Sequence, residues 1–281
     1  MIWKQYAGHL AWPTLALVAA LLVCDVALVT AGVLRVIPLW VAGLLLVPVA
    51  YGWFTPLHEA VHGNVGGTKA RAWLDQGVGW LSALAYAAPF SAFQAVHLRH
   101  HGTVNKAGRD PDLWVKGGTP LAVAARCLTI VPHYYWRFMG EMRNESVAMR
   151  VAVRRAVVAM SLLAVVVGSL AWAGFALEIL VLWVLPGWLA SGILSFAFDW
   201  LPHHPHDDTG RYTNARVLRG GPVLTVLMAG QDAHLVHHLW PKVPFYRYIT
   251  VFHATRAELE ANGSPIVELL GSRPPERTPA G

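Results

Sequence analysis

Charged residues are scarce in this chain: 14% of its 281 residues are Asp, Glu, Lys or Arg, and 55% are hydrophobic. Ordinary soluble domains carry about 25% charged residues. Cysteine is scarcer still. Cys24 and Cys127 form no C-x-x-C pair, so we expect neither a disulfide framework nor a cysteine metal or redox site, and we predict packing roles for both. The sequence also lacks internal repeats and nucleic-acid-binding motifs.

What the chain has instead is long apolar stretches with almost no charge. Four of them approach the roughly 20 residues that a helix needs to cross a bilayer, at 12–33, 36–56, 156–176 and 179–201. The first is too long, and too closely followed by the second, for a cleaved signal peptide. It contains Asp25, a carboxylate that could be functional at this position, but for which we predict structural pairing or interfacial snorkelling. A fifth stretch, 77–96, holds Pro89 and several Gly, and we predict an interfacial or re-entrant helix there.

The basic residues indicate how these helices lie in the membrane. All 22 Lys and Arg residues except Arg35 lie on one side of the four predicted spans or near that interface. Basic residues concentrate on the cytoplasmic side, so both termini and the long polar segments are predicted to be cytoplasmic. The predicted fold class is an all-α integral protein of the cell (inner) membrane, with four transmembrane helices in two hairpins, interfacial helices and a cytoplasmic helical cap. Residues 1–270 are predicted to form one domain, and 271–281 a flexible tail.

The stretch LHEAVHGN (57–64) contains two chemically different patterns. His58, Glu59 and His62 form a literal H-E-x-x-H, which on a helix is the signature of zinc proteases, with Glu as general base. The same letters are also a plain H-x-x-x-H, which would be one part of a larger histidine set. The first interpretation predicts peptide hydrolysis, and the second predicts oxygen activation.

Most of the 14 histidines are grouped in short boxes. Their spacings of i, i+3 and i+4 place the imidazoles of one box on one face of a helix. A lone histidine is more often a packing residue than a ligand, but repeated boxes at helical ligand spacing indicate metal binding. The boxes are LHEAVHGN, HLRHH (97–101), LPHHPH (201–206) and HLVHH (234–238).

The number of histidines favours the second interpretation of LHEAVHGN. A catalytic zinc takes three protein ligands and a water, so a protease would leave about half a dozen boxed histidines without a role. Imidazole alone does not choose between zinc, copper, iron and nickel. Soluble di-iron bundles use Glu and Glu-x-x-His pairs, for which 16 Asp and Glu residues provide no matching set. We therefore predict a two-metal histidine site, with Glu59 as a neighbour rather than a protease base.

The pattern H-x3-H, H-x2-HH, H-x2-HH resembles the membrane fatty acid desaturase superfamily. Several flanking words resemble one branch of it, the desaturase-like β-carotene hydroxylases, over residues 57–248. Two features depart from that branch: Glu59 stands where Asp is common, and LPHHPH offers three histidines where the pattern needs one. The words are DPD (110–112), FDWLPH (198–203), NARV (214–217) and GQDAHLVHHLWPKVPFY (230–246).

The resemblance implies an O2-dependent non-haem di-iron oxidoreductase that hydroxylates the β-ionone ring of carotenoids. Asp199, four residues before His203, is expected to orient a ligand or to reach iron through a water molecule. Packing or surface roles are expected for His9, His133, His206 and His253. The ligands implied for the two iron ions are His58, His62, His97, His100, His101, His203, His234, His237 and His238.

The partners follow from the same resemblance and from what the chain lacks. A lipid-soluble substrate would enter from the bilayer, and O2 would be the co-substrate. The sequence holds no flavin, haem or cluster motif, so a separate, ferredoxin-like donor would supply the electrons. Three other interpretations stay open: an acyl-lipid desaturase or hydroxylase of the same superfamily, a metal-binding membrane protein without activity, and an intramembrane protease.

Overall fold

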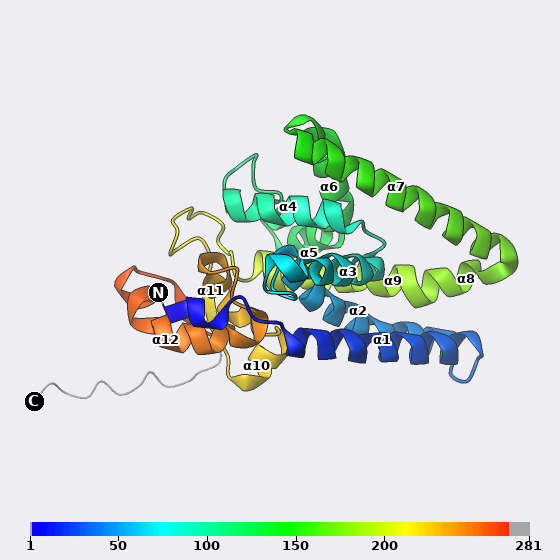
Figure 1. Cartoon of the computed structure of the whole chain (residues 1–281), viewed down its shortest axis with the longest axis horizontal. Coiled ribbons are helices and arrows are strands. Elements are labelled where there is room, and N and C mark those ends of the chain that lie inside the picture. The colour runs from blue at the N-terminus through cyan, green and yellow to red at the C-terminus, as the bar shows by residue number, and fades with distance from the viewer. Residues whose placement is uncertain (1, 270–281) are drawn as a thin grey trace, which may run out of the picture.

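Two long helical hairpins extend from one end of the molecule and lie against each other (Figure 1). A computed structural model describes residues 2–269, so the predicted tail at 271–281 falls outside the described residues. The first hairpin consists of α1 (Trp12–Val33) and α2 (Leu39–Val61), and its turn contains Arg35. The Arg35 guanidinium contacts the Glu178 carboxylate at 2.5 Å, which joins the tips of the two hairpins.

The second hairpin is one continuous helical stretch that reverses direction. It runs from Val147 to Trp200 and includes α7 (Val147–Leu170), α8 (Ala176–Ile179) and α9 (Leu185–Leu194). Gly174 has a φ of 98°, a conformation that glycine adopts without strain, and the chain turns back there. The described residues therefore hold three helices long and apolar enough to cross a membrane, and the third contains two of the four predicted spans. Four separate crossings remain a prediction.

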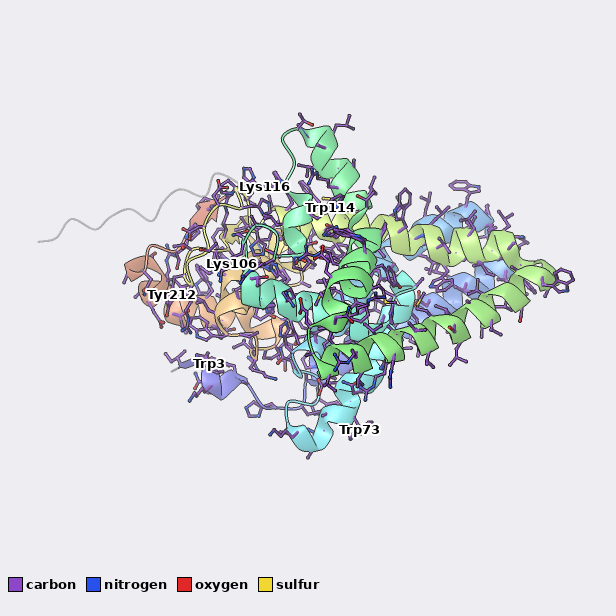
Figure 2. All side chains as sticks on the ribbon, turned by 90° about the horizontal axis from the view of Figure 1, so that it is seen from above. Trp3, Trp73, Lys106, Trp114, Lys116 and Tyr212 are labelled. Atoms are coloured by element: carbon purple, nitrogen blue, oxygen red, sulfur yellow. The ribbon has the colours of Figure 1, made fainter. Side chains whose placement is uncertain are left out.

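The outer faces of these helices present apolar side chains rather than a protein core. Only 6% of the most apolar window of α1 is buried, and Leu22, Val23 and Val26 all point outward. Apolar surface of this extent is unfavourable in water and is expected in lipid. Figure 2 shows the opposite end of the molecule, where the labelled Lys106 and Lys116 lie on loops of the cap. The chain is thus an integral membrane protein with one lipid-facing and one polar end.

Glycines bring the two hairpins into close contact. A Cβ on Gly43 of α2 would lie 2.6 Å from the carbonyl oxygen of Val181 in the second hairpin. Gly187 of α9 in turn lets the second hairpin approach the turn between α3 and α4, where a Cβ would lie 2.3 Å from the Ala85 carbonyl oxygen. Small residues let helix backbones approach in this way within membranes. Near the opposite face of α2, the Trp53 indole donates a hydrogen bond of 2.5 Å to Asp25. The predicted structural pairing of Asp25 is confirmed.

The apolar stretch at 77–96 forms two short helices instead of the single helix we predicted. α3 (Ala72–Ala83) and α4 (Phe90–Thr103) are separated by a turn in which Ala87 has a φ of 49°. Pro89 precedes α4 and restricts the backbone at that point. The Tyr86 hydroxyl donates to the Ala50 carbonyl oxygen at 2.5 Å, which holds the turn against α2. Neither helix is among the candidate spans of the described residues.

The cap covers the end of the hairpins from which the histidines project. Its core contains Leu235, Val236, Tyr248 and Phe252, all fully buried. Contrary to the all-α prediction, two short parallel strands, β1 (Val217–Arg219) and β2 (Ile266–Glu268), pair in the cap. Their three-residue length is too short to leave an alternating pattern in the sequence. The helices of the cap and its connections are α5 (Pro120–Leu128), α6 (Ile130–Trp136), α10 (Pro222–Leu227), α11 (His234–Leu239) and α12 (Tyr248–Ala261).

Short helical segments of other pitch connect these elements. Four π-helical segments lie at Arg137–Glu141, Ala171–Phe175, Leu180–Val184 and Ser195–Trp200. The 3-10 segments lie at Ile2–Tyr6, Lys69–Arg71, Leu84–Tyr86, Asp112–Val115, Met142–Asn144, Gln231–Ala233 and Phe245–Arg247.

Candidate metal centre

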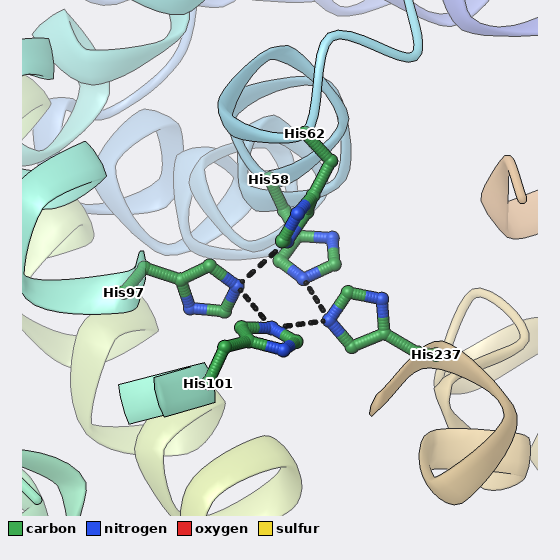
Figure 3. Close-up of side chains that lie close together, drawn as sticks. All are labelled: His58, His62, His97, His101 and His237. Carbon is green, nitrogen blue, oxygen red and sulfur yellow. Dashed lines mark hydrogen bonds between the residues drawn. The ribbon is translucent and has the colours of Figure 1, made fainter. Parts of the chain in front are cut away.

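Five imidazoles from three helices meet at the boundary between the hairpins and the cap (Figure 3). α2 continues beyond its predicted end at residue 56; its last turn carries His58, and His62 follows directly at its C-terminal cap. α4 contributes His97 and His101, one helical turn apart, and α11 contributes His237. The Nε2 atoms are close neighbours: 3.0 Å for His58 and His237, and 3.0 Å for His62 and His97. His101 Nε2 lies 3.1 Å from that of His97 and 2.9 Å from that of His237.

Four further imidazoles form a second group beside the first. His100 comes from α4, His203 from the loop after the second hairpin, and His234 and His238 from α11. The Nε2 atom of His234 lies 3.0 Å from those of both His203 and His238, and His100 Nε2 lies 3.4 Å from His238 Nε2. The ligand atoms of each group all lie within 4.8 Å of one another. The structure therefore brings together all nine histidines that the resemblance implied as ligands.

The outer ring nitrogens show which nitrogen carries the proton. His203 Nδ1 lies 2.9 Å from the Asn214 carbonyl oxygen, and His234 Nδ1 lies 2.8 Å from Gln231 Oε1. Because these oxygens can only accept, each Nδ1 is the donor and each Nε2 carries a bare lone pair. Two lone pairs 3.0 Å apart repel each other unless a cation lies between them. The second group is thus chemically suited to a metal ion.

The spacing of the Nε2 atoms also fits coordination. Imidazole nitrogens bind a divalent transition metal at about 2.0–2.1 Å. Two ligands at right angles around one ion would then lie about 3 Å apart, and the neighbouring pairs described above lie 2.9–3.4 Å apart. Two groups of this kind could hold two metal ions.

Burial keeps most of these imidazoles in the neutral form that binds metal. It lowers the pKa of His203 to about 3, and it lowers the pKa of other group members well below the usual value. These other members are His62, His97, His101, His234, His237 and His238.

His100 has a different electrostatic environment from the rest. Its Nδ1 lies 2.9 Å from Asp110 Oδ1 and 3.2 Å from Asp112 Oδ2, and all three side chains are buried. Burial lowers the pKa of His100, but the carboxylates of Asp112 and Asp110 outweigh that effect and raise it to about 10. The Tyr134 hydroxyl donates to Asp112 Oδ1 at 2.6 Å. The two carboxylates thus fix the ring and would balance the charge of a cation bound at its Nε2.

Glu59 belongs to neither of the histidine groups. Its side chain is fully buried, and the Asn64 amide lies 3.5 Å from Oε1. The Tyr248 hydroxyl lies 2.9 Å from His237 Nδ1 and also interacts with Glu59. A protease would need this carboxylate beside a metal-bound water, whereas here it lies behind a tyrosine that supports a candidate ligand.

The remaining histidines lie outside both groups. His204 is adjacent to His203 in LPHHPH, where the sequence offered three histidines for one ligand position. Its side chain is exposed, and its ring centroid lies 4.7 Å from that of Trp200. His9 and His253 are exposed, and His133 stacks on Trp114. His206 is buried, but its ring centroid lies 6.4 Å from that of His203 and it belongs to neither group.

An apolar cavity leads from between the hairpins to the first group. The rings of Phe54 and Phe93 line it and stack on His58 and His97, with centroids 5.5 Å apart in each pair. Asp199 also lines the cavity. It lies in the π-helical segment Ser195–Trp200 and interacts electrostatically with His100, so its predicted role toward a ligand or iron remains a prediction.

Several residues of the site were not identified from the sequence. Asp110 and Asp112 stood in the quoted word DPD, but no role was given to them. Ser191 and Ser195 line the cavity on the same helix as Asp199. Their spacing of four residues, continued by Asp199 and His203, is a signal that the sequence contains. Gln231 and Tyr248 had no comparable signal, because they reach His234 and His237 through tertiary packing.

The apolar helices and the two imidazole groups define an integral membrane protein in which histidines could hold a pair of metal ions. Residues 34–269 match the model of the fatty acid desaturase family. The chain therefore belongs to the fatty acid desaturase family and is an oxidoreductase, which confirms the predicted superfamily.

The chain is also similar to two beta-carotene ketolases from strains of Paracoccus. One is 32% identical over 206 residues, which cover 71% of this chain and 73% of the relative. The other is 32% identical over 215 residues, which cover 74% of this chain and 76% of the relative.

Proposed function

We propose that this protein is a membrane di-iron oxygenase that oxidises a ring carbon of carotenoids. The observation that carries the proposal is that an apolar cavity between the membrane hairpins reaches the first imidazole group at His97, with the second group beside the first. One iron ion would be held by His58, His62, His97, His101 and His237, and the other by His100, His203, His234 and His238.

When bound, the two iron ions would supply the O2 chemistry that no amino-acid side chain provides. One turnover consumes O2, two electrons and two protons, converts a C–H bond to C–OH and releases one water. The protein orients the imidazoles through their outer nitrogens, as with Asn214 at His203 and Gln231 at His234. The apolar wall formed by Phe54 and Phe93 excludes water and presents one carbon of the substrate.

Two observations support a carotenoid as the substrate. The cavity is apolar and opens among helices that face lipid, as an insoluble molecule requires. The similar proteins from Paracoccus are described as beta-carotene ketolases. A second candidate, an acyl-lipid desaturase or hydroxylase, is supported by the description of the matching family.

Hydroxylation and ketone formation share their first step. The sequence words predicted a hydroxylase, whereas the similar proteins are described as ketolases. A second hydroxylation of the same carbon would give a geminal diol, which loses water to form a ketone. One hydroxylation of a carbon therefore gives the alcohol, and two hydroxylations of the same carbon give the ketone. Both products fit the proposed activity.

The electrons would come from a separate, ferredoxin-like donor at the cytoplasmic face of the cell membrane. The cap carries exposed basic side chains, of which Lys106 and Lys116 are visible in Figure 2. Basic residues concentrate on the cytoplasmic side of membrane proteins and attract acidic partners. This orientation, with four crossings and both termini inside, is part of the proposal.

Expression in cells that accumulate β-carotene tests the proposed function. We expect chromatography of the pigments to show new, more polar carotenoids, with masses that separate hydroxyl from ketone products. A matched strain with His238→Ala should show none. Unchanged pigments together with new double bonds or hydroxyls in the acyl lipids would replace this proposal by the second candidate.

A further inference from the structure

Polar side chains form one wall of the otherwise apolar cavity. Ser191, Ser195 and Asp199 line it from the last membrane helix, at successive intervals of four residues. Tyr134 and Tyr135 line it from α6. Polar groups within a membrane helix are unfavourable and usually have a function. We refer to these five residues as the polar wall.

The polar wall still has hydrogen-bonding capacity. The hydroxyls of Ser191, Tyr134 and Tyr135 donate to the Gly187 carbonyl, Asp112 and the Ala87 carbonyl at 2.7, 2.6 and 2.9 Å respectively. Their oxygens keep lone pairs that can accept a proton donor.

Ser195 and Asp199 add further hydrogen-bonding groups to the polar wall. Ser195 Oγ is buried next to the Cys127 thiol and the Asp199 carboxyl, and it makes no hydrogen bond of good geometry. Its hydroxyl can both donate and accept. Asp199 adds carboxyl oxygens on the same wall.

We propose that the preferred substrate ring already carries a hydroxyl group, which hydrogen-bonds to the polar wall near Ser195. This inference rests on the proposed function and specifies its substrate. A hydroxyl both donates and accepts, so it can pair with the lone pairs of the tyrosines and with the Ser195 hydroxyl. A purely hydrocarbon ring offers no such partner and would leave the buried Ser195 hydroxyl without a hydrogen bond.

The energetic consequence is a preference for the hydroxylated ring over the hydrocarbon ring. A site that hydrogen-bonds a substrate hydroxyl discriminates against the analogue that lacks it, because its own buried polar groups are then unpaired. A reaction that hydroxylates the ring would precede this one, and the oxygen added here would be the second on the ring. Ser195 contributes more to this preference than the tyrosines do. The hydroxyl protons of Tyr134 and Tyr135 are already donated within the protein, so these residues can only accept a hydrogen bond from the substrate.

The test compares β-carotene with the diol that carries one hydroxyl on each ring. The full chain is purified in lipid nanodiscs, and conversion of each pigment is measured with iron and a reducing system. Binding of each pigment to chelator-treated protein is measured by quenching of tryptophan fluorescence. We expect kcat/KM and affinity to favour the diol by at least about fivefold, and Ser195→Ala to bring both ratios close to one.

Ser169→Ala provides the matched control. Ser169 lies on α7, is exposed, and donates to the Val165 carbonyl four residues earlier, as Ser191 does to Gly187. Its substitution should keep the wild-type ratios. Asp199→Asn should preserve more of the preference than Asp199→Leu, with the iron content measured for both.

The outcomes separate the inference from the proposed function. Equal conversion of the two pigments, or a preference for β-carotene, would overturn the inference and leave carotenoid oxidation standing. Retention of the diol preference in Ser195→Ala would also overturn it. Conversion of neither pigment would overturn both proposals.

Discussion

Several imidazoles of the two groups use their two ring nitrogens for different purposes. The outer Nδ1 atoms of His203 and His234 donate to oxygens of the protein, which leaves their Nε2 atoms free toward the centre. Partners of this kind fix the ring orientation and the tautomer of a metal ligand, and their loss typically weakens metal binding or activity by about 10–100-fold. The contribution of each residue can therefore be tested separately.

The candidate ligands should be far more sensitive to substitution than the histidines outside the groups. His97→Ala and His238→Ala each remove an Nε2 atom from one group, so we expect loss of bound iron and of pigment conversion. His253→Ala, at an exposed position on α12, should behave like the wild type. Iron content by mass spectrometry and conversion by chromatography are measured at equal expression. Near-normal conversion by His97→Ala with full iron loading would contradict the assignment.

Glu59 and Tyr248 should act together on His237. Tyr248→Phe removes the hydroxyl that lies 2.9 Å from His237 Nδ1. Glu59→Gln removes the negative charge of the carboxylate that interacts with this hydroxyl. We expect each substitution to lower conversion by about 10–100-fold, with a smaller additional loss in the double variant because the two act through one ring. Tyr212→Phe, which loses only an exposed contact with Glu258, is the control. Complete loss in Glu59→Gln with unaltered Tyr248→Phe would instead favour a direct catalytic role for the carboxylate.

Among single residues, the candidate ligands were easier to predict than the residues that hydrogen-bond to their outer ring nitrogens. Helical spacing puts the histidines of a box on one face, and the resemblance to the desaturase superfamily then implied which nine of them are ligands. The partners of their outer nitrogens come from distant parts of the chain: Asn214 reaches His203 from the cap, and Tyr248 reaches His237 from α12. No local periodicity records such contacts.

At the level of elements, the membrane helices follow from hydropathy, but their ends do not. The first span agrees with α1 at both ends, whereas α2 continues past Pro56 to Val61. That extension packs against α1, α3 and α4. A hydropathy count does not distinguish burial by protein from burial by lipid, so it does not predict where the helix ends. The strands β1 and β2 were missed for a related reason: they pair across the cap and carry no pattern of their own.

The positions of the loops should reveal the number of crossings. In a background with Cys24→Ala and Cys127→Ala, single cysteines at Thr68, Thr103 and Thr213 should all react with a membrane-impermeant thiol reagent from the cytoplasmic side. A cysteine at Gly174, where the second hairpin reverses, should react only from the outside. These results are expected because the four histidine boxes converge. Labelling of Thr68 and Thr103 from opposite faces would make the segment containing α3 and α4 a true crossing.

At the level of the whole molecule, metal should hold the cap and the hairpins together. The first imidazole group joins α2, α4 and α11, so a ligand that binds only the folded arrangement stabilises it. We expect about two iron ions per chain, and a lower unfolding temperature after treatment with a chelator. Free iron at about 100 times its dissociation constant would contribute about 2.7 kcal/mol.

Metal analysis and thermal unfolding of protein purified without added zinc measure this effect. Restoration of both thermal stability and activity by iron, and not by zinc, is the expected result. One zinc per chain, with activity restored by zinc alone, would contradict the di-iron proposal. His253→Ala serves again as the control, because its loss removes no group member.

The order of the histidines along the chain has a consequence for biosynthesis. The first group combines His58, on the first hairpin, with His237, which follows the second hairpin. The pairing of β1 with β2 then closes the cap over this region using residues 266–268. A ribosome must therefore release the chain beyond His238, and both hairpins must be inserted, before the two groups of ligands are complete. Under the di-iron proposal, iron would be acquired only after these steps, and the iron supply of the cell would set the fraction of inserted protein that matures.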